Sequence, residues 1–313
     1  MPSTFSAVKN TICPQKSDFT VDHIPDLTGQ VAVVTGGNTG LGKETVKALL
    51  QHGAKVYMAS RNKERASAAI QDLKELTGKE AIFLQIELTS LASVKRAATE
   101  FLSKEDKLHM LFNNAGVMWA DVALVSEDGY DWQFAANALG HFLFTELLTP
   151  ALIAGHSTAP NGRCRVVNTS SLSAMNLTMK WDTLKDGPAR KKTSSDDLYS
   201  QSKFINVVHA LEIERRYGAR GVAAFSVNPG LLKTDMQRDF NPVLRAVLYT
   251  FFQDASQGAL TQLWAGTMEE PLAHSGAFCT PIAKIGECRK EAYDPEIGKM
   301  LWEFCLDAVK NFL

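Results

Sequence analysis

Residues 31–42 read VAVVTGGNTGLG, an apolar run that ends in a glycine-rich turn. Gly36, Gly40 and Gly42 allow the backbone to turn tightly and to approach a bound pyrophosphate closely. The helix predicted at residues 40–52 would point its N-terminal amides and the positive end of its dipole at the same anion. A glycine pattern can also be an ordinary turn, but here it stands between a predicted strand and a predicted helix, the context that dinucleotide binding requires. We expect the cofactor contacts of this turn to be Gly36, Asn38, Thr39, Gly40, Leu41 and Gly42.

Apolar and amphipathic stretches alternate along the rest of the chain, which is typical of βαβ units and a parallel sheet. Predicted strands lie at residues 30–35, 55–60, 81–85, 108–113, 163–170, 222–228 and 276–279. Predicted helices lie at residues 40–52, 61–76, 134–154, 198–217 and 295–312. The pattern predicts an α/β protein with a single-domain Rossmann fold, a doubly wound parallel sheet with helices on both faces.

The predicted domain spans residues 29–313 and follows an N-terminal extension at 1–28. Two stretches, 172–197 and 231–252, break the alternation and are expected to be excursions from the domain rather than domains of their own. The first is polar and poor in periodicity, and the second is rich in aromatic residues. Long loops of this kind in a compact domain are often functional lids.

The composition argues against several classes of protein. Hydrophobic residues make up 45% of the chain, and the formal net charge is −1 at pH 7. The five cysteines are scattered without a CxxC pair or a histidine at metal-ligand spacing, which favours reduced thiols over a disulfide or a zinc site. Residues 1–28 lack the apolar stretch of a signal peptide or membrane anchor. We expect a cytoplasmic protein with no metal, no nucleic acid partner and no membrane association.

The end of the second predicted strand indicates which dinucleotide binds. An enzyme that uses NAD usually has an acidic residue there, whose carboxylate binds the ribose hydroxyls. This chain has Ser60 followed by Arg61. A hydroxyl and a guanidinium suit the 2′-phosphate of NADP, because both donate hydrogen bonds to it. The alternative is that Arg61 only begins a solvated helix. The pair favours NADP(H).

Tyr199 and Lys203 carry the strongest chemical signal. They stand four residues apart in a predicted helix, so the phenol and the ammonium share one face. A nearby lysine and the positively charged nicotinamide ring would both favour the phenolate and lower the tyrosine pKa. We expect Tyr199 to exchange a proton with a substrate oxygen while a hydride moves to or from the adjacent carbon.

Ser171 and Asn137 are placed to assist. Ser171 follows a buried strand, where its hydroxyl could hydrogen-bond a developing alkoxide. Asn137 lies in a long predicted helix and is placed to hold a water that links Lys203 to solvent. Each of these residues also has a plain structural explanation, since serines often follow strands and a helical asparagine can be merely hydrogen-bonded.

Taken together, the motifs resemble the short-chain dehydrogenase/reductases in order and spacing, from about Leu27 to beyond Thr234. They are TGxxxGxG at 35–42, NNAG at 113–116, Asn137, Ser171, YxxxK at 199–203 and PG at 229–230. Phrases such as GKET, NNAGVM and DGYDWQFAANALGHF are most similar to retinol-dehydrogenase-like proteins and related fungal reductases.

The resemblance implies a role for each of these residues. Tyr199 would be the acid–base group, Lys203 would bind the nicotinamide ribose, Ser171 would orient the substrate, and Asn137 would complete a proton relay. Asn114, Ala115 and Gly116 would border the adenosine and ribose, with Glu87 and Leu88 beside the adenine. Asn228, Pro229, Gly230 and Thr234 would lie near the nicotinamide.

The sequence departs from the family pattern at three places. Ser171 and Tyr199 are separated by 199 − 171 = 28 positions, more than is common, and we expect the extra residues to form a loop with Arg190, Lys191 and Lys192 exposed at its tip. Glu87 stands where an aspartate is usual. The membrane-spanning start of several retinol dehydrogenases is not expected here.

The substrate is expected to be a medium-sized hydrophobic ketone, aldehyde or secondary alcohol, and reduction is the favoured direction if the cofactor is NADPH. Apolar residues that would line its pocket are Met118, Trp119, Met175, Trp181, Met236, Tyr249, Phe251 and Phe252. The alternatives are a non-catalytic NADP-binding protein, an imine reductase and a cyclase on the same scaffold. The resemblance implies a homodimer paired through the helices at 134–154 and 198–217, or a monomer as in related retinol-dehydrogenase-like members.

Overall fold

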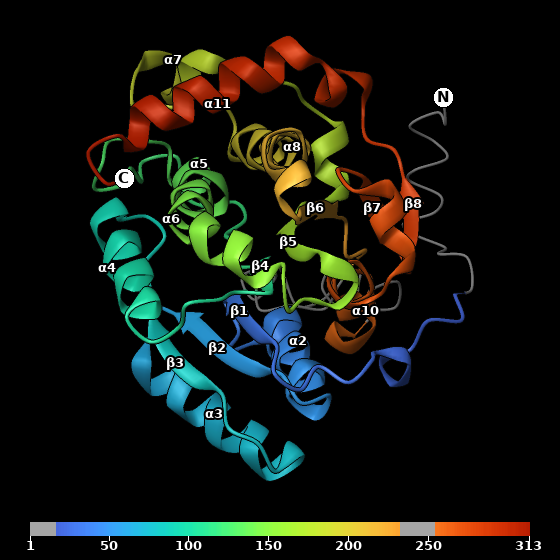
Figure 1. Ribbon diagram of the computed structural model, residues 1–313. Helices are drawn as coiled ribbons and strands as arrows, with labels where there is room; N and C mark the ends of the chain where they lie inside the picture. The colour runs from blue at the N-terminus through green and yellow to red at the C-terminus, as the bar shows by residue number, and fades with distance from the viewer. Residues whose placement is uncertain (1–16, 232–253) are drawn as a thin grey trace, which may run out of the picture.

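The computed structural model describes residues 17–231 and 254–313 (Figure 1). Within the predicted N-terminal extension, Ile24 and Leu27 are buried against the main domain, and Val21–His23 form one turn of 3₁₀ helix, η1. The second predicted excursion lies almost entirely outside the described residues, and so does Thr234.

The described strands form one sheet in the order β3-β2-β1-β4-β5-β6-β7-β8. Their bounds are β1 Val31–Thr35, β2 Lys55–Ser60, β3 Ile82–Gln85, β4 Met110–Asn113, β5 Cys164–Thr169, β6 Val222–Val227, β7 Phe278–Thr280 and β8 Lys284–Gly286. Neighbouring strands are parallel except for β7 and β8, which are antiparallel. The strand order reverses between β1 and β4, the position where doubly wound sheets bind ligands. The predicted fold class is confirmed, and β8 is an addition that the sequence pattern did not predict.

The central strands are apolar on both faces because helices cover both. In β1, Val31 and Val33 join one core cluster while Ala32 and Val34 join the other. A strand buried in this way reads as a continuous apolar run rather than an alternating one. The run that precedes the glycine turn is therefore the centre of the sheet.

The two faces of the sheet carry different helices (Figure 1). One face is covered by α2 (Gly40–Gln51), α3 (Lys63–Thr77) and α10 (Ala255–Thr267). The other is covered by α4 (Leu91–Leu102), α6 (Gly140–Gly155) and α8 (Ser195–Tyr217), and α11 (Pro295–Val309) lies outside α8 as a further layer. The sequence pattern did not predict α4 or α10.

The helix predicted at residues 134–154 is continuous but not uniform. It begins as α5 (Trp132–Phe134), passes through a π-helical turn, η2 (Ala135–Leu139), and continues as α6. Among the described helices, this combined stretch, Trp132–Gly155, has the length and hydropathy of a membrane span, but 72% of its most apolar window is buried inside the fold. Burial of that extent is typical of a core helix.

The excursion after Ser171 is packed rather than open. It contains two 3₁₀ turns, η4 (Leu172–Met175) and η5 (Trp181–Thr183), and a short helix, α7 (Pro188–Lys191). The prediction that Arg190 is exposed at a loop tip is wrong, because its side chain is fully buried among carboxylates and carbonyls, whereas Lys191 next to it is 62% exposed. A run of basic residues in the sequence does not show which of them has buried acceptors to pair with.

Helix α8 is enclosed within a single chain. Every residue from Leu198 to Ala210 is buried between the sheet, α5 and α11. A homodimer through α6 and α8 stays a prediction, and its contacts would have to come from side chains other than those of residues 198–210.

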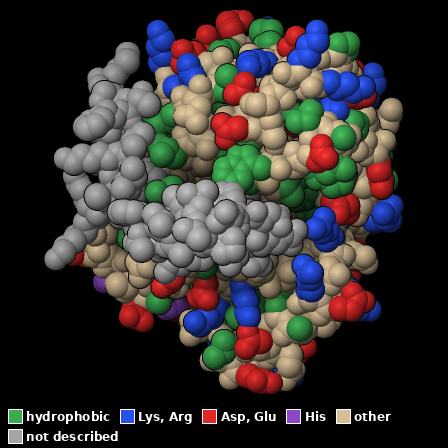
Figure 2. All heavy atoms as spheres, turned by 180° about the vertical axis from the view of Figure 1, so that it is seen from behind, with side chains coloured by type: hydrophobic (Ala, Val, Ile, Leu, Met, Phe, Trp, Pro, Cys, Tyr) green, Lys and Arg blue, Asp and Glu red, His purple; other side chains and the backbone are tan. Residues whose placement is uncertain are grey.

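The surface opposite the view of Figure 1 mixes charges of both signs (Figure 2). Lysine, arginine and acidic side chains are interspersed over the described part of that face. Such a surface lacks the one-sided basic character of a typical nucleic-acid footprint.

Trp302 packs α11 against α6 and α8. Its ring lies 4.9 Å from the ring of Phe142, edge to face, and the guanidinium of Arg216 lies 4.2 Å from its centroid. We predict that Trp302→Ala lowers the free energy of unfolding by about 3–5 kcal/mol, because a large buried side chain is lost and a cavity remains. Urea denaturation measures the effect. Met300→Ala, on the exposed side of the same helix, is the matched control and should change stability by less than about 0.5 kcal/mol; equal losses in the two variants would contradict the packing described here.

Candidate active site

The glycine turn after β1 depends on close backbone contacts. Gly36 has φ +67° and Gly40 has φ +52°, a region in which glycine alone is unstrained. A Cβ on Gly42 would overlap the carbonyl oxygen of Gly36, so α2 can begin against the turn only if this position is glycine. The three glycines of the sequence pattern are thus required by the local structure.

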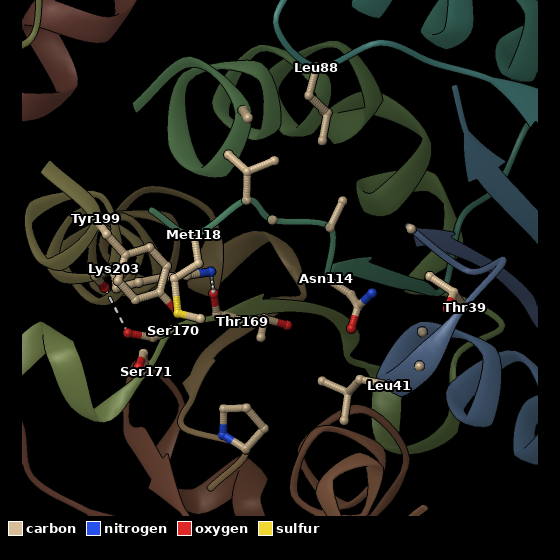
Figure 3. A pocket seen from close by; sticks show the side chains of 18 of the residues that line it. Thr39, Leu41, Leu88, Asn114, Met118, Thr169, Ser170, Ser171, Tyr199 and Lys203 are labelled. Atoms are coloured by element: carbon tan, nitrogen blue, oxygen red, sulfur yellow. Dashed lines mark hydrogen bonds between the residues drawn. The ribbon is translucent and has the colours of Figure 1, made fainter. Parts of the chain in front are cut away.

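A cavity of about 570 Å³ runs along the carboxyl ends of β1, β2, β4 and β5 (Figure 3). Thr39 and Leu41 lie toward one end, and Tyr199, Lys203 and Ser171 gather at the other. The predicted site residues that line it are Gly36, Asn38, Thr39, Gly40, Leu41, Gly42, Ser60, Arg61, Glu87, Leu88, Asn114, Ala115, Gly116, Ser171, Tyr199, Lys203, Pro229 and Gly230. Asn137 lies behind Gly116 rather than on the wall.

The cofactor end has the groups expected to hold an anion. The Ser60 hydroxyl at the end of β2 is buried, and among the described residues it has no hydrogen-bond partner. Arg61 follows it with a side chain that is 67% exposed and pairs loosely with Glu87 at 3.9 Å. Arg65, in the first turn of α3, also lines the cavity. The Ser60 hydroxyl without a partner and the two arginines that line the same end of the cavity are groups that can hold an anion.

Arg65 was missed in the sequence, although a signal for it existed. The helix predicted from residue 61 places a residue four positions later on the same face as Arg61.

Glu87 lines the cavity near Arg61, and its carboxylate also bonds the chain after β3. Its Oε1 accepts hydrogen bonds from the amide and the hydroxyl of Thr89 at 3.2 and 2.9 Å. Glu87 thereby orders the loop after β3 while it lines the cavity.

Lys203 is buried with one carbonyl as its acceptor. Its Nζ donates a hydrogen bond to Thr169 O at 2.9 Å and lies 5.7 Å from the centroid of the Tyr199 ring (Figure 3). The hydroxyl of Ser170 donates a hydrogen bond to Lys203 O at 2.7 Å. This bond fixes the turn of α8 from Tyr199 to Lys203 against the end of β5. The predicted pairing of the phenol and the ammonium on one helix face is present.

The pKa of Tyr199 in the free protein goes against the sequence expectation. Burial raises the pKa of Tyr199 to about 12, and a hydrogen bond from Ser171 opposes this only in part. Burial also lowers the pKa of Lys203 to about 8, since desolvation disfavours the ammonium. With a pKa this high, the phenol keeps its proton at neutral pH in the free protein. The effect of a positively charged nicotinamide ring on this pKa remains a prediction.

Ser171 takes part in a short chain of donors. The amide N–H of Ser173 donates to Ser171 Oγ at 3.1 Å, which leaves the Ser171 proton for the Tyr199 oxygen or a substrate oxygen. Because the serine oxygen already accepts a hydrogen bond, its own proton becomes a better donor. The turn η4, which supplies that amide, is therefore part of the site.

Asn137 anchors the wall of the cavity. Its Oδ1 accepts from the amide of Val117 at 2.8 Å, and its Nδ2 donates to Val117 O and to Ser202 Oγ, both at 2.9 Å. These contacts fix the segment between Gly116 and Met118 against α8. The water that Asn137 was expected to hold stays a prediction.

His141, which the sequence analysis did not single out, links the two halves of the site. Its Nε2 lies 2.9 Å from Thr35 Oγ1 and its Nδ1 lies 3.1 Å from Asn137 O. Burial lowers the pKa of His141 to about 4, so the ring is neutral at pH 7. The Thr35 hydroxyl also accepts the amides of Asn114 and Ala115, each at 2.9 Å. A histidine four residues after the asparagine was the only sequence signal for this link.

The substrate end of the cavity is largely apolar. Met118, Trp119, Leu172 and Met175 line it together with the uncharged polar residues Ser173 and Asn176. Trp181 was expected here, but its ring packs 6.2 Å from that of Phe304, between the excursion and α11. The four other aromatic and methionine residues expected in this pocket, Met236, Tyr249, Phe251 and Phe252, lie outside the described residues.

The cysteines have no special chemistry in the described part of the chain. Cys164, Cys279, Cys288 and Cys305 are free and buried, and burial raises the pKa of each thiol. Within residues 17–231 and 254–313, no group of three histidine, cysteine, aspartate or glutamate residues could hold a metal ion.

The geometry agrees with comparisons to known proteins. The family described as short chain dehydrogenase matches residues 30–183. A short-chain dehydrogenase/reductase of the fungus Armillaria gallica is 53% identical over 93% of this chain and 94% of its own length. One from Phomopsis amygdali is 36% identical over the full length of both proteins. The chain belongs to the short-chain dehydrogenase/reductase family. As a member of this family it is an oxidoreductase, and its most similar relatives include fungal proteins.

Solved structures of the family share the fold. An uncharacterised protein of Mycobacterium paratuberculosis superposes with a TM-score of 0.74 at 27% identity, over 94% of this chain and 98% of that one. The RhlG/NADP active-site complex of Pseudomonas aeruginosa has a TM-score of 0.65 at 20% identity, over 82% and 96%. These likenesses support the sheet order and the helical layers, and family membership supports a nicotinamide cofactor.

The buried ammonium of Lys203 makes the stability of this oxidoreductase depend on pH. The pKa of Lys203 is about 8 in the folded chain, against 10.5 when exposed, so between these values the unfolded chain binds more protons than the folded one. The contribution of Lys203 to the free energy of unfolding should therefore rise as the pH rises from about 8 to about 10.5. Lys203→Met should remove this rise.

The measurement is the difference in the free energy of unfolding between the wild type and Lys203→Met, taken at several pH values by urea denaturation. Lys191→Met, which removes an exposed lysine, is the control and should give a difference that does not change with pH. A constant difference for Lys203→Met as well would show that the Lys203 ammonium is not desolvated in the folded chain.

Proposed function

We propose that this oxidoreductase uses NADPH to reduce the carbonyl group of a medium-sized, uncharged, apolar ketone or aldehyde. One observation carries the proposal. A single cavity has a glycine turn and two guanidiniums at one end, and Ser171, Tyr199 and Lys203 at the other. The intervening distance is spanned by the carboxyl ends of parallel strands, as a dinucleotide requires.

The preference for NADP(H) rests on Ser60, Arg61 and Arg65. A buried hydroxyl without a partner in the described chain is a cost to the folded protein unless a ligand satisfies it. Arg61 and Arg65, which line the same end of the cavity, supply positive charge and several donors, which match a phosphate in geometry. Bound there, NADPH would supply the hydride.

The proton would come from the protein. Tyr199 carries a phenol that is protonated in the free enzyme, because burial raises its pKa to about 12. The Ser171 hydroxyl, whose oxygen accepts the Ser173 amide, would hold the substrate oxygen and stabilise the charge that develops on it. Lys203, as an ammonium, would favour transfer of the phenolic proton by stabilising the phenolate left behind.

The substrate class rests on the lining of the far end. The described residues there are apolar or uncharged, with Met118, Trp119 and Met175 as the large ones. A charged substrate would lose its hydration without gaining a partner. Methionine side chains adapt to irregular apolar shapes, which suits an extended or ring-containing ketone. A role in secondary or lipid metabolism and a cytoplasmic location are part of the same proposal.

We predict that Tyr199→Phe lowers kcat for ketone reduction by at least about 100-fold, because the proton donor is lost. The dissociation constant for NADPH, measured by nucleotide fluorescence, should change by less than about threefold, since the aromatic ring remains. Tyr217→Phe, on the same helix but bonded to Glu146, is the control and should retain activity. Undiminished ketone reduction by the Tyr199 variant would contradict its role as the proton donor. A cyclisation that survives Tyr199→Phe would favour a cyclase that uses the cofactor site as a scaffold, whereas NADPH binding without turnover of any carbonyl would favour a non-catalytic NADP-binding protein.

Arg61 and Arg65 should determine the choice between NADPH and NADH. Replacing both by alanine should lower the ratio of kcat/KM for NADPH to that for NADH by about tenfold or more, because the contacts to the phosphate are lost. Steady-state kinetics with both nucleotides measures the ratio. Lys63 is the first residue of α3 and stands between these two arginines in the sequence. Lys63→Ala serves as the matched control. If the ratio is unchanged in the double variant, these arginines do not read the 2′-phosphate.

A further inference from the structure

Arg190 is a fully buried arginine in the segment between Ser171 and Tyr199. Its guanidinium pairs with Asp186 at 2.9 Å and with Asp131 at 3.5 Å. It also donates hydrogen bonds to two backbone carbonyls of a different loop, Val122 O at 2.7 Å and Leu124 O at 3.3 Å. Burying this cation is costly, and it is balanced here by acceptors from two separate parts of the chain. The side chain thus joins the segment that contains α7 to residues 122–124.

Two further hydrogen bonds join the same parts of the chain. The hydroxyl of Ser195 donates to Ala120 O at 2.7 Å. The indole N–H of Trp119 donates to Asp196 Oδ1 at 3.1 Å. Together with the contacts of Arg190, these bonds tie residues 119–124, which we call the rim loop, to residues 186–196. The tie runs from the rim of the cavity to the first turn of α8, the helix that carries Tyr199.

Trp119 has an unusual backbone for its size. Its φ is +54°, a region that bulky residues rarely adopt, and its side chain lines the cavity while it remains 43% exposed. Such a conformation persists only where the surroundings enforce it, and it is found most often at functional sites. The ties to residues 186–196 are contacts that help to enforce it.

We propose that Arg190 is a positioning residue that holds the rim loop, and with it Trp119, against the substrate end of the cavity. The inference rests on the proposed function for its effect on kinetics, but not for its effect on the loop. Trp119 forms an aromatic wall at the cavity mouth and discriminates among substrates by their bulk. The additional residues between Ser171 and Tyr199 include residues 186–196, the segment that holds Trp119 in this position.

Arginine suits this position better than lysine. Its planar guanidinium carries five N–H donors in a rigid fork, so it can contact two carbonyls and two carboxylates at once. A lysine ammonium has three donors at a single point and cannot reach both loops in the same way. Arg190→Lys therefore keeps the charge but should lose at least one of the two carbonyl contacts.

The test compares Arg190→Met with Lys191→Met, the neighbouring exposed cation. Since Arg190→Met alone leaves Asp131 buried without a cation, the double variant Asp131→Asn/Arg190→Met is included, because asparagine can still accept the Phe134 amide at the start of α5. Ser195→Ala removes one tie without leaving any buried charge. Hydrogen exchange by mass spectrometry, without substrate or nucleotide, follows the rim loop in each variant.

We expect the amides of the rim loop to exchange at least about tenfold faster in the Arg190 variants and in Ser195→Ala than in Lys191→Met, because protection follows the local opening equilibrium. With NADPH saturating, KM for a bulky aryl ketone should rise by about tenfold while kcat changes by less than about threefold. KM for a small aliphatic ketone and the dissociation constant for NADPH should stay within about twofold. Arg190→Lys should lie between the wild type and Arg190→Met.

Unchanged exchange in the rim loop of the Arg190 variants would overturn the proposal. An equal loss of kcat for bulky and small ketones would also overturn it, since that outcome indicates general damage to the site. If the wild type reduces no carbonyl compound, the proposed function fails, and exchange alone then decides whether Arg190 holds the loop.

Discussion

The burial of the Lys203 ammonium is the constraint on which the site depends. Its charge is removed from water, and the acceptor that meets it is the carbonyl oxygen of Thr169, at the end of β5. Desolvation is the cause of its lowered pKa, which means that the folded chain bears an electrostatic cost at neutral pH. That cost is offset by the apolar packing of α8, which the sheet encloses on one side and α11 on the other. The outer helix therefore belongs to the support of the site, although it contributes nothing to the cavity wall.

The carboxyl ends of different parallel strands form different parts of the cavity. β1 and β2 end at the glycine turn and at Ser60, where the groups suit a phosphate. β4 and β5 end at Asn113 and Thr169, and the carbonyl of Thr169 accepts the hydrogen bond of the buried Lys203 ammonium on α8. The Thr35 hydroxyl joins these halves, since it accepts amides from the chain after β4 and contacts His141 of the long helix. A shift in the register of β1 would therefore disturb both halves together.

The site residues that could be predicted from the sequence are those whose arrangement depends only on neighbours close in the sequence. Glycines that permit close backbone approach, and a tyrosine and a lysine spaced by one helical turn, could be predicted because local geometry alone brings them together. Sequence reasoning failed where partners are distant in the sequence. The run Arg190, Lys191 and Lys192 has the composition of a solvated tip, yet the Arg190 guanidinium is buried against carbonyls 68 and 66 positions earlier. Likewise, the part of the expectation that a neighbouring lysine lowers the Tyr199 pKa did not consider burial, which raises this pKa in the free protein. Helix α10 was missed because its residues are almost all buried, so it shows little amphipathic periodicity.

The structure separates the groups that perform chemistry from those that shape the substrate end. Tyr199, Lys203 and Ser171 are held by the sheet and by α8, so their geometry is fixed by the core of the domain. Met118 and Trp119 lie in the chain after β4, and the rim loop that begins at Trp119 is tied to Arg190 and to the first turn of α8 rather than to the sheet. Substitutions in the rim loop or at Arg190 should therefore move Trp119 without disturbing the strand ends or the buried ammonium. If the proposed function holds, a fold organised in this way would allow the accepted carbonyl compounds to change while one arrangement for hydride and proton transfer is kept. In that proposal the ion pairs of the buried Arg190 guanidinium with Asp131 and Asp186 hold the substrate end in place.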